Sequence, residues 1–163
     1  MASVKKRHQS GFTYMALLFF VAIMGVTLAA TGQLWSTAQQ RIKERELLYI
    51  GGEFQRAIGA YYERTPGAIK RFPTQLDDLL TDRRMAGTVH HLRRIYLDPM
   101  TLSADWGLVQ APDGGIMGVY SHSTSTPVKT GNFADEQAGF DAAESYADWR
   151  FIYVPAKEAV PGR

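Results

Sequence analysis

The segment GFTYMALLFFVAIMGVTLAATGQLW, residues 11–35, decides how this chain is organised. From residue 12 to residue 35 it contains no Asp, Glu, Lys, Arg or His. An α-helix rises about 1.5 Å per residue, so a helix of this length can cross a hydrocarbon layer roughly 30 Å thick. The sequence therefore predicts a transmembrane helix at residues 12–35.

A short basic leader precedes this helix. It carries Lys-Lys-Arg at residues 5–7, ends in Gly11 and is followed directly by Phe12 and Thr13. An ordinary secretory signal is cut after an apolar segment of about 7–15 residues, whereas here the polar-to-apolar break comes before a longer one. The junction resembles that of type IV prepilins. The resemblance implies that a prepilin peptidase cuts between Gly11 and Phe12 and that Phe12 is then N-methylated.

Two further segments resemble the pseudopilins of type II secretion systems. The stretch FPTQLDDLL, residues 72–80, is similar to the F/Y-P-x-x-L-x-x-L element that follows the long helix in that family. Asp98-Pro99 and Asp105-Trp106-Gly107 are similar to a D-P-W-G element split by an insertion. The family usually has Glu as the fifth residue after the cut, where this chain has Ala16. A minor subunit at the filament tip, or an assembly in which another subunit supplies the charge, is therefore implied, and major versus minor stays open.

The helix is predicted to continue beyond residue 35. Residues 36–62 contain no proline, and Thr-Pro-Gly at residues 65–67 ends the helix. Apolar residues at spacings of three and four predict one buried face, formed by Leu47, Ile50, Phe54, Ile58 and Tyr61. Gly51 and Gly52 inside this half indicate a bend or a close contact.

Small residues follow one face of the first half of the helix. They are Ala22, Gly25, Ala29 and Gly32, at spacings of three, four and three. Small residues let helix backbones approach closely in lipid, so this stripe is predicted to pack helices together in a filament.

The rest of the chain predicts a small α+β domain. Residues 106–110 and 116–121 read as a hairpin around Pro-Asp-Gly-Gly, and residues 148–154 as a third strand. The expected fold is pilin-like: a long N-terminal transmembrane helix acts as the spine of a periplasmic domain with a short antiparallel sheet. Its core should hold Phe54, Ile58, Tyr61, Trp106 and Trp149. The expected divisions are a leader at 1–11, the transmembrane helix at 12–35, its soluble half at 36–64, the domain at 65–155 and a tail at 156–163.

No catalytic or metal-binding pattern stands out. The chain has no cysteine, and no Ser-His-Asp set, phosphate loop or complete metal spacing is recognisable. His90 and His91 are a residue type that binds zinc, but the side chains of adjacent residues point apart. This favours a solvated loop or helix face over a zinc site. Asp135, Glu136 and Asp141 could offer oxygen ligands to calcium, but the alternating acidic pattern of a calcium loop is missing. The sequence thus predicts neither an enzyme nor a cofactor, with calcium as the alternative.

Charge gives little information about partners. Three of the 18 Lys and Arg residues lie in the leader, so the rest of the chain has 15 basic residues and 16 acidic ones. This balance does not indicate a nucleic-acid partner. Three basic residues before the predicted span face three just after it, so orientation rests on the resemblance.

The resemblance implies a pseudopilin in a short periplasmic filament, with a mechanical role in protein secretion. Its partners would be other pseudopilins, the prepilin peptidase, an inner-membrane assembly platform and the lipid bilayer. It would be a single-pass inner-membrane protein with its C-terminal domain in the periplasm. A type IV pilin or minor pilin, or a membrane-anchored binding module without a filament, are the alternatives.

Overall fold

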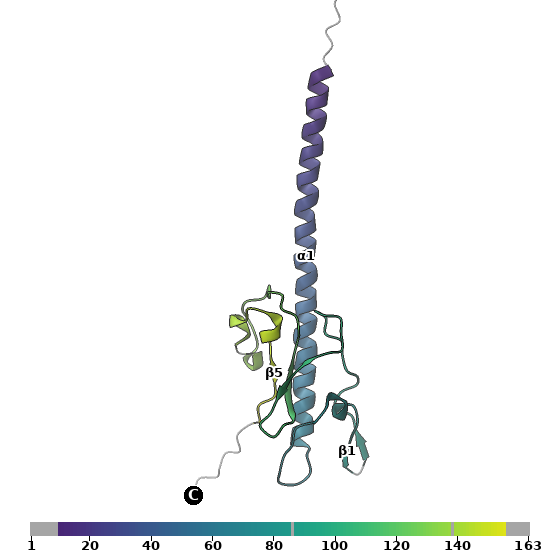
Figure 1. Ribbon diagram of the computed structural model, residues 1–163, viewed down its shortest axis with the longest axis vertical. Coiled ribbons are helices and arrows are strands. Elements are labelled where there is room, and N and C mark those ends of the chain that lie inside the picture. The colour runs from purple at the N-terminus through teal and green to yellow at the C-terminus, as the bar shows by residue number, and fades with distance from the viewer. Residues whose placement is uncertain (1–9, 86, 138, 156–163) are drawn as a thin grey trace, which may run out of the picture. The chain divides into compact units, whose positions relative to one another are not determined.

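The computed structural model describes residues 10–85, 87–137 and 139–155, and at 26–35 it describes the helix without its side chains. The first element, helix α1, spans Ser10–Glu63 (Figure 1). The chain divides into two compact units, residues 1–40 and residues 41–163, and α1 contributes to both. Each unit is described by itself.

The first unit corrects the prediction of a transmembrane helix. Crossing a bilayer takes about 20 consecutive apolar residues. The described apolar side chains run from residue 12 to residue 25, and charged residues begin at Arg41. In the described part of the chain, no helix combines the length and the apolar character needed to cross a membrane. Residues 26–35, which complete the predicted span, lie outside the described side chains. The predicted fold class is therefore wrong in its transmembrane helix, and the single-pass inner-membrane localisation is contradicted with it.

The second unit is built on the end of α1. The predicted apolar stripe is confirmed, because all five of its side chains are buried: Leu47, Ile50, Phe54, Ile58 and Tyr61. The helix ends at Glu63, two residues before Thr65, where the Thr-Pro-Gly segment begins. This stripe forms one wall of the hydrophobic core.

A three-stranded antiparallel sheet supplies further core residues. Its strands β3 (Gly107–Gln110), β4 (Ile116–Tyr120) and β5 (Phe151–Ile152) are ordered β3-β4-β5. The predicted hairpin is therefore present as β3 and β4, and its turn contains Gly114 at φ +83°. The predicted third strand pairs with β4 over two residues only, fewer than the seven expected.

The structure also contains elements that the sequence did not predict. A second sheet pairs β1 (Asp82–Met85) with β2 (Gly87–Val89), where the sequence indicated a solvated loop or helix face. Within the FPTQLDDLL segment, residues 72–80, lies a single 3-10 turn, η1 (Leu76–Leu79). The loop before β5 holds three more 3-10 turns: η2 (Asp135–Gln137), η3 (Phe140–Ala142) and η4 (Tyr146–Asp148).

The core contains all five residues predicted for it, and aromatic rings fill much of it. Trp149 is fully buried and stacks on Phe140 with ring centroids 5.6 Å apart. Gly51 explains how β5 reaches the helix: an added Cβ there would lie 2.4 Å from the Phe151 ring. The close contact foreseen for the glycine pair is therefore present at Gly51, while a Cβ at Gly52 would meet only Arg56, at 3.5 Å.

Candidate functional site

The predicted cleavage site lies at the start of α1. Gly11 and Phe12 belong to its first turn, and the Phe12 side chain is 83% exposed. An added Cβ at Gly11 would meet nothing within 4 Å, so the fold itself does not require glycine there. Helix ends open at little cost in free energy, so a peptidase could reach this bond after the first turn unwinds. The role of Gly11 and Phe12 stays a prediction.

Large apolar side chains cover the same part of α1. Between residues 12 and 21 the exposed ones include Phe12, Leu17, Leu18, Phe19, Phe20 and Val21. Contiguous exposed apolar surface of this kind marks a site of contact with another apolar surface. Of the residues predicted to pack in a filament, Ala22 and Gly25 are exposed among these side chains. Ala29 and Gly32 lie outside the described side chains.

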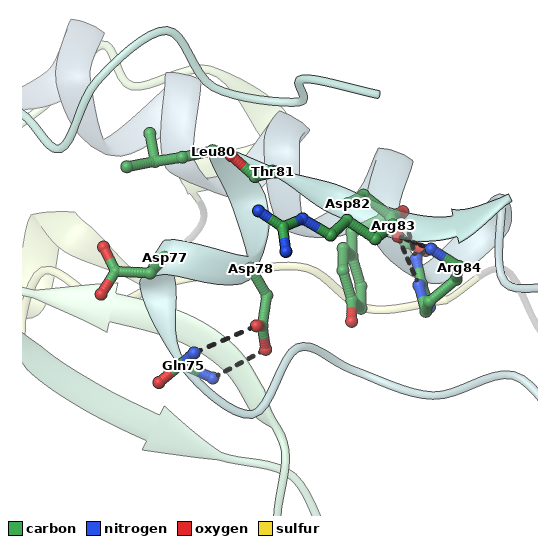
Figure 2. A pocket seen from close by; sticks show the side chains of 9 residues that line it. Gln75, Asp77, Asp78, Leu80, Thr81, Asp82, Arg83 and Arg84 are labelled. Atoms are coloured by element: carbon green, nitrogen blue, oxygen red, sulfur yellow. Dashed lines mark hydrogen bonds and ion pairs between the residues drawn. The ribbon is translucent and has the colours of Figure 1, made fainter. Parts of the chain in front are cut away.

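In the second unit, a polar cluster joins the β1–β2 hairpin to the end of α1. Figure 2 shows Arg84 bonded to Asp82, two residues before it on β1. The Arg84 guanidinium lies 3.4 Å from the centre of the Tyr61 ring and donates hydrogen bonds to the Tyr61 carbonyl and to the Thr65 hydroxyl. On the other side of Asp82, His91 lies 3.0 Å from the carboxylate, and both side chains are 1% exposed. The expectation of a solvated loop or helix face was thus wrong for His91.

Electrostatics keep the Asp82 carboxylate ionised near neutral pH. The hydrogen bonds from Arg84, with help from His91, hold the pKa of the Asp82 carboxyl well below its usual range. The same contact with Asp82 raises the pKa of Arg84, and burial raises the pKa of the Tyr61 hydroxyl. A carboxylate that stays ionised and fully hydrogen-bonded is a poor proton donor or acceptor near neutral pH. The cluster therefore serves as a structural joint.

A depression of about 560 Å³ lies beside this joint. Arg83 and Thr81 line it, together with Asp78 from η1 (Figure 2). Asp78 is occupied, because its carboxylate accepts hydrogen bonds from the backbone N–H groups of Thr74 and Gln75 and from the Thr74 hydroxyl. Among the residues that line it, no nucleophile lies next to a base.

A second depression, of about 520 Å³, lies between α1 and β5. The Gln55 side chain donates to the Ile152 carbonyl there, at 2.8 Å. The Tyr153 hydroxyl donates to Glu63 at 2.6 Å, and this bond with burial raises its pKa to about 12. These contacts hold the last strand against the helix.

Glu44 is a buried acidic residue of α1 that the sequence did not single out. It is 2% exposed, and its carboxylate accepts hydrogen bonds from the backbone N–H groups of Val128 and Lys129 and from the Tyr146 hydroxyl. Three donors compensate the buried charge, so Glu44 fastens the loop before β5 to α1. Its position beside the apolar stripe, three residues before Leu47, was the available signal.

The split D-P and W-G segments come together in the structure. Asp98 is fully buried and accepts hydrogen bonds from the Met100 backbone and from the hydroxyls of Thr101 and Ser121. The Trp106 indole donates to the Tyr96 carbonyl at 2.8 Å. The intervening residues thus form a loop that Asp98 attaches to the end of β4.

Metal binding finds no support in the described residues. Among them, no three or more His, Cys, Asp or Glu side chains are grouped so as to hold a metal ion. The structure therefore does not bring Asp135, Glu136 and Asp141 together as a ligand set, and His90 and His91 diverge. His91 is bound to Asp82, whereas His90 is exposed and contacts the Leu80 carbonyl.

Comparisons with known proteins add no relative. No protein-family model matches the chain, and neither do any of the curated proteins or the solved structures. Functional argument therefore rests on the residues and on their geometry.

Proposed function

We propose that this chain is a pseudopilin, a subunit that assembles through its N-terminal helix into a short filament of a type II secretion system. Its role would be mechanical: subunits added at the base lengthen the filament and push the exported protein outward. A prepilin peptidase would first cut between Gly11 and Phe12, and an assembly platform would add the subunits. A type IV pilin or minor pilin subunit is the second candidate, because the same helix would serve either filament.

The observation that carries the proposal is the exposed apolar surface of α1. Phe12, Phe19 and Phe20 are 83%, 70% and 66% exposed, and they lie within nine residues of one helix. Burying a side chain of this size stabilises a contact by about 1.5–3 kcal/mol. Equivalent helices from neighbouring subunits would supply an apolar partner of the same length.

The second unit supports the proposal in a different way. Glu44 and Asp98 fix its loops, and the sheet packs on the far end of the same helix. The charged, loop-rich surface of this unit offers no recognisable reaction chemistry among its described residues. A subunit that works by transmitting force needs such a fixed body attached to its assembly helix.

Assembly of a surface variant tests the proposal. The chain would be produced with a glutamate-bearing pseudopilin, and filaments would be collected by sedimentation and counted by electron microscopy. Phe19→Ser removes an exposed apolar side chain and should lower incorporation by about tenfold or more, as expected for the loss of 1.5–3 kcal/mol per contact. The matched control is Ile69→Ser, since Ile69 is 74% exposed but lies after α1, and its incorporation should equal that of the parent chain. Equal incorporation of both variants would contradict the proposal.

A further inference from the structure

Two surfaces of opposite charge lie on the second unit. The first, here called the arginine surface, belongs to residues 83–94, which contain four Arg and no Asp or Glu; its exposed members are Arg83, Arg93 and Arg94. The second, here called the acidic loop, belongs to residues 135–144, which contain no Lys or Arg; its exposed members are Asp135, Glu136, Asp141 and Glu144. The fourth arginine, Arg84, is already used by Asp82.

The charges of both surfaces have no ion-pair partner in the described part of the chain. Across the described residues, every salt bridge involves Arg56, Arg84, His91 or His122, and none includes a member of either surface. The Arg94 guanidinium lies 5.1 Å from the centre of the Tyr96 ring, a cation–π contact that leaves it without a carboxylate partner. Seven exposed charges, three positive and four negative, are therefore available to another molecule.

Both surfaces are held in place by contacts within the second unit. Figure 1 shows β1 on one side of α1 and the 3-10 turns that precede β5 on the other. The joint of Arg84 with Tyr61 and Thr65 fixes the hairpin. The acidic loop is fixed by Phe140, which stacks on the buried Trp149.

We infer that the arginine surface of one copy docks on the acidic loop of the next copy in the filament. This inference rests on the proposed function and adds the contact between the second units. Because the two complementary surfaces are formed by different residues, a contact between them is head-to-tail, and such a contact repeats along a filament instead of closing a dimer. Exposed ion pairs add little affinity, but they set the register and exclude wrong neighbours. The apolar helix contact would supply the affinity between copies, and the charged surfaces would set their register.

Disulfide crosslinking tests the contact in the full chain, because the natural sequence has no cysteine. Thr88→Cys places a thiol on the exposed part of β2, and Ala142→Cys places one on the exposed part of η3. Under assembly conditions with a mild oxidant, a mixture of the two single variants should give crosslinked dimers, and each variant alone should give none. The chain that carries both cysteines should give a ladder of multimers. Ala68→Cys, exposed in the loop after α1, replaces Thr88→Cys as the matched control and should give no crosslink.

Charge reversal separates this contact from the helix contact. Arg93→Glu with Arg94→Glu should lower the crosslinked fraction by about tenfold, since like charges then face each other. Asp141→Arg with Glu144→Arg in the other variant should restore it. Filaments that form normally, with no 88–142 crosslink and no effect of reversal, would overturn this inference and leave the proposed function standing. Failure to form any filament, even together with a glutamate-bearing pseudopilin, would overturn both.

Discussion

Adding a methyl group at two adjacent glycines of α1 should have opposite effects on stability. At Gly51 the new Cβ would lie 2.4 Å from three atoms of the Phe151 ring, which is buried and cannot move aside. Overpacking of this kind costs about 1–3 kcal/mol, and alanine returns about 0.5–1 kcal/mol in a helix, so Gly51→Ala should lower the free energy of unfolding by about 1–2 kcal/mol. At Gly52 the only neighbour is the flexible end of Arg56 at 3.5 Å, so Gly52→Ala should raise it by about 0.5–1 kcal/mol.

Thermal unfolding of the full chain measures both changes. Tryptophan fluorescence reports on the second unit, because Trp106 and Trp149 lie in its core. At roughly 4 °C per kcal/mol, the Tm should fall by about 4–8 °C for Gly51→Ala and rise by about 2–4 °C for Gly52→Ala. Phe151→Leu combined with Gly51→Ala should cost less than the sum of the two single changes. A Gly51→Ala chain as stable as Gly52→Ala would refute the contact between α1 and β5.

Three further changes test other parts of the account. Trp149→Ala removes the centre of the aromatic cluster and should cost about 3–5 kcal/mol, measured as a lower urea midpoint; an unchanged midpoint would mean that the end of the chain is not packed on the core. Asp82 has a pKa held below its unfolded value, so its stabilisation should be complete above about pH 4 and be lost as pH falls further. Urea midpoints between pH 2 and pH 7 should therefore depend less on pH in Asp82→Asn, and parallel profiles would count against the joint. Ala16→Glu should improve filament formation by the chain alone, because a carboxylate could then pair with a neighbour's N-terminal amine; long regular fibres from the unchanged chain would exclude a minor subunit.

Much of the second unit could be predicted, because its main features depend on sequence patterns that span only a few residues. The stripe from Leu47 to Tyr61 follows the helical repeat, and a repeat of large apolar residues has few alternatives to burial. The Pro-Asp-Gly-Gly turn predicts the hairpin of β3 and β4, because Gly114 adopts a positive φ that other residues avoid. Both features depend on residues close together in the sequence.

The polar joints could not be predicted in the same way. Asp82 and His91 lie nine residues apart in a basic segment, and a charge run normally indicates a solvated surface. The pairing of β1 with β2 brings the two side chains together. The hydrogen bond between them then offsets the free-energy cost of burying them. Glu44 likewise meets Val128 across 84 residues of sequence, so the helical pattern can indicate that Glu44 is buried but not which residues bind it.

The exposed helix shows where sequence and structure disagree. The transmembrane prediction measured apolar length along residues 12–35, whereas the described side chains supply the apolar run only to residue 25. The prediction for the cleavage site depends on the junction alone and is independent of that length.

The N-terminus of the mature chain tests the central claim most directly. The full chain would be produced together with a prepilin peptidase, and its intact mass and N-terminal sequence determined. The proposed function predicts a chain that begins at Phe12 with a methylated amine. Gly11→Ala is the matched control: it leaves the fold intact, since its Cβ meets nothing within 4 Å, and it should be cut less, with larger residues blocking the cut more fully. A chain that still begins at Met1 beside an active peptidase, or one cut near Ala30, would contradict the pseudopilin assignment.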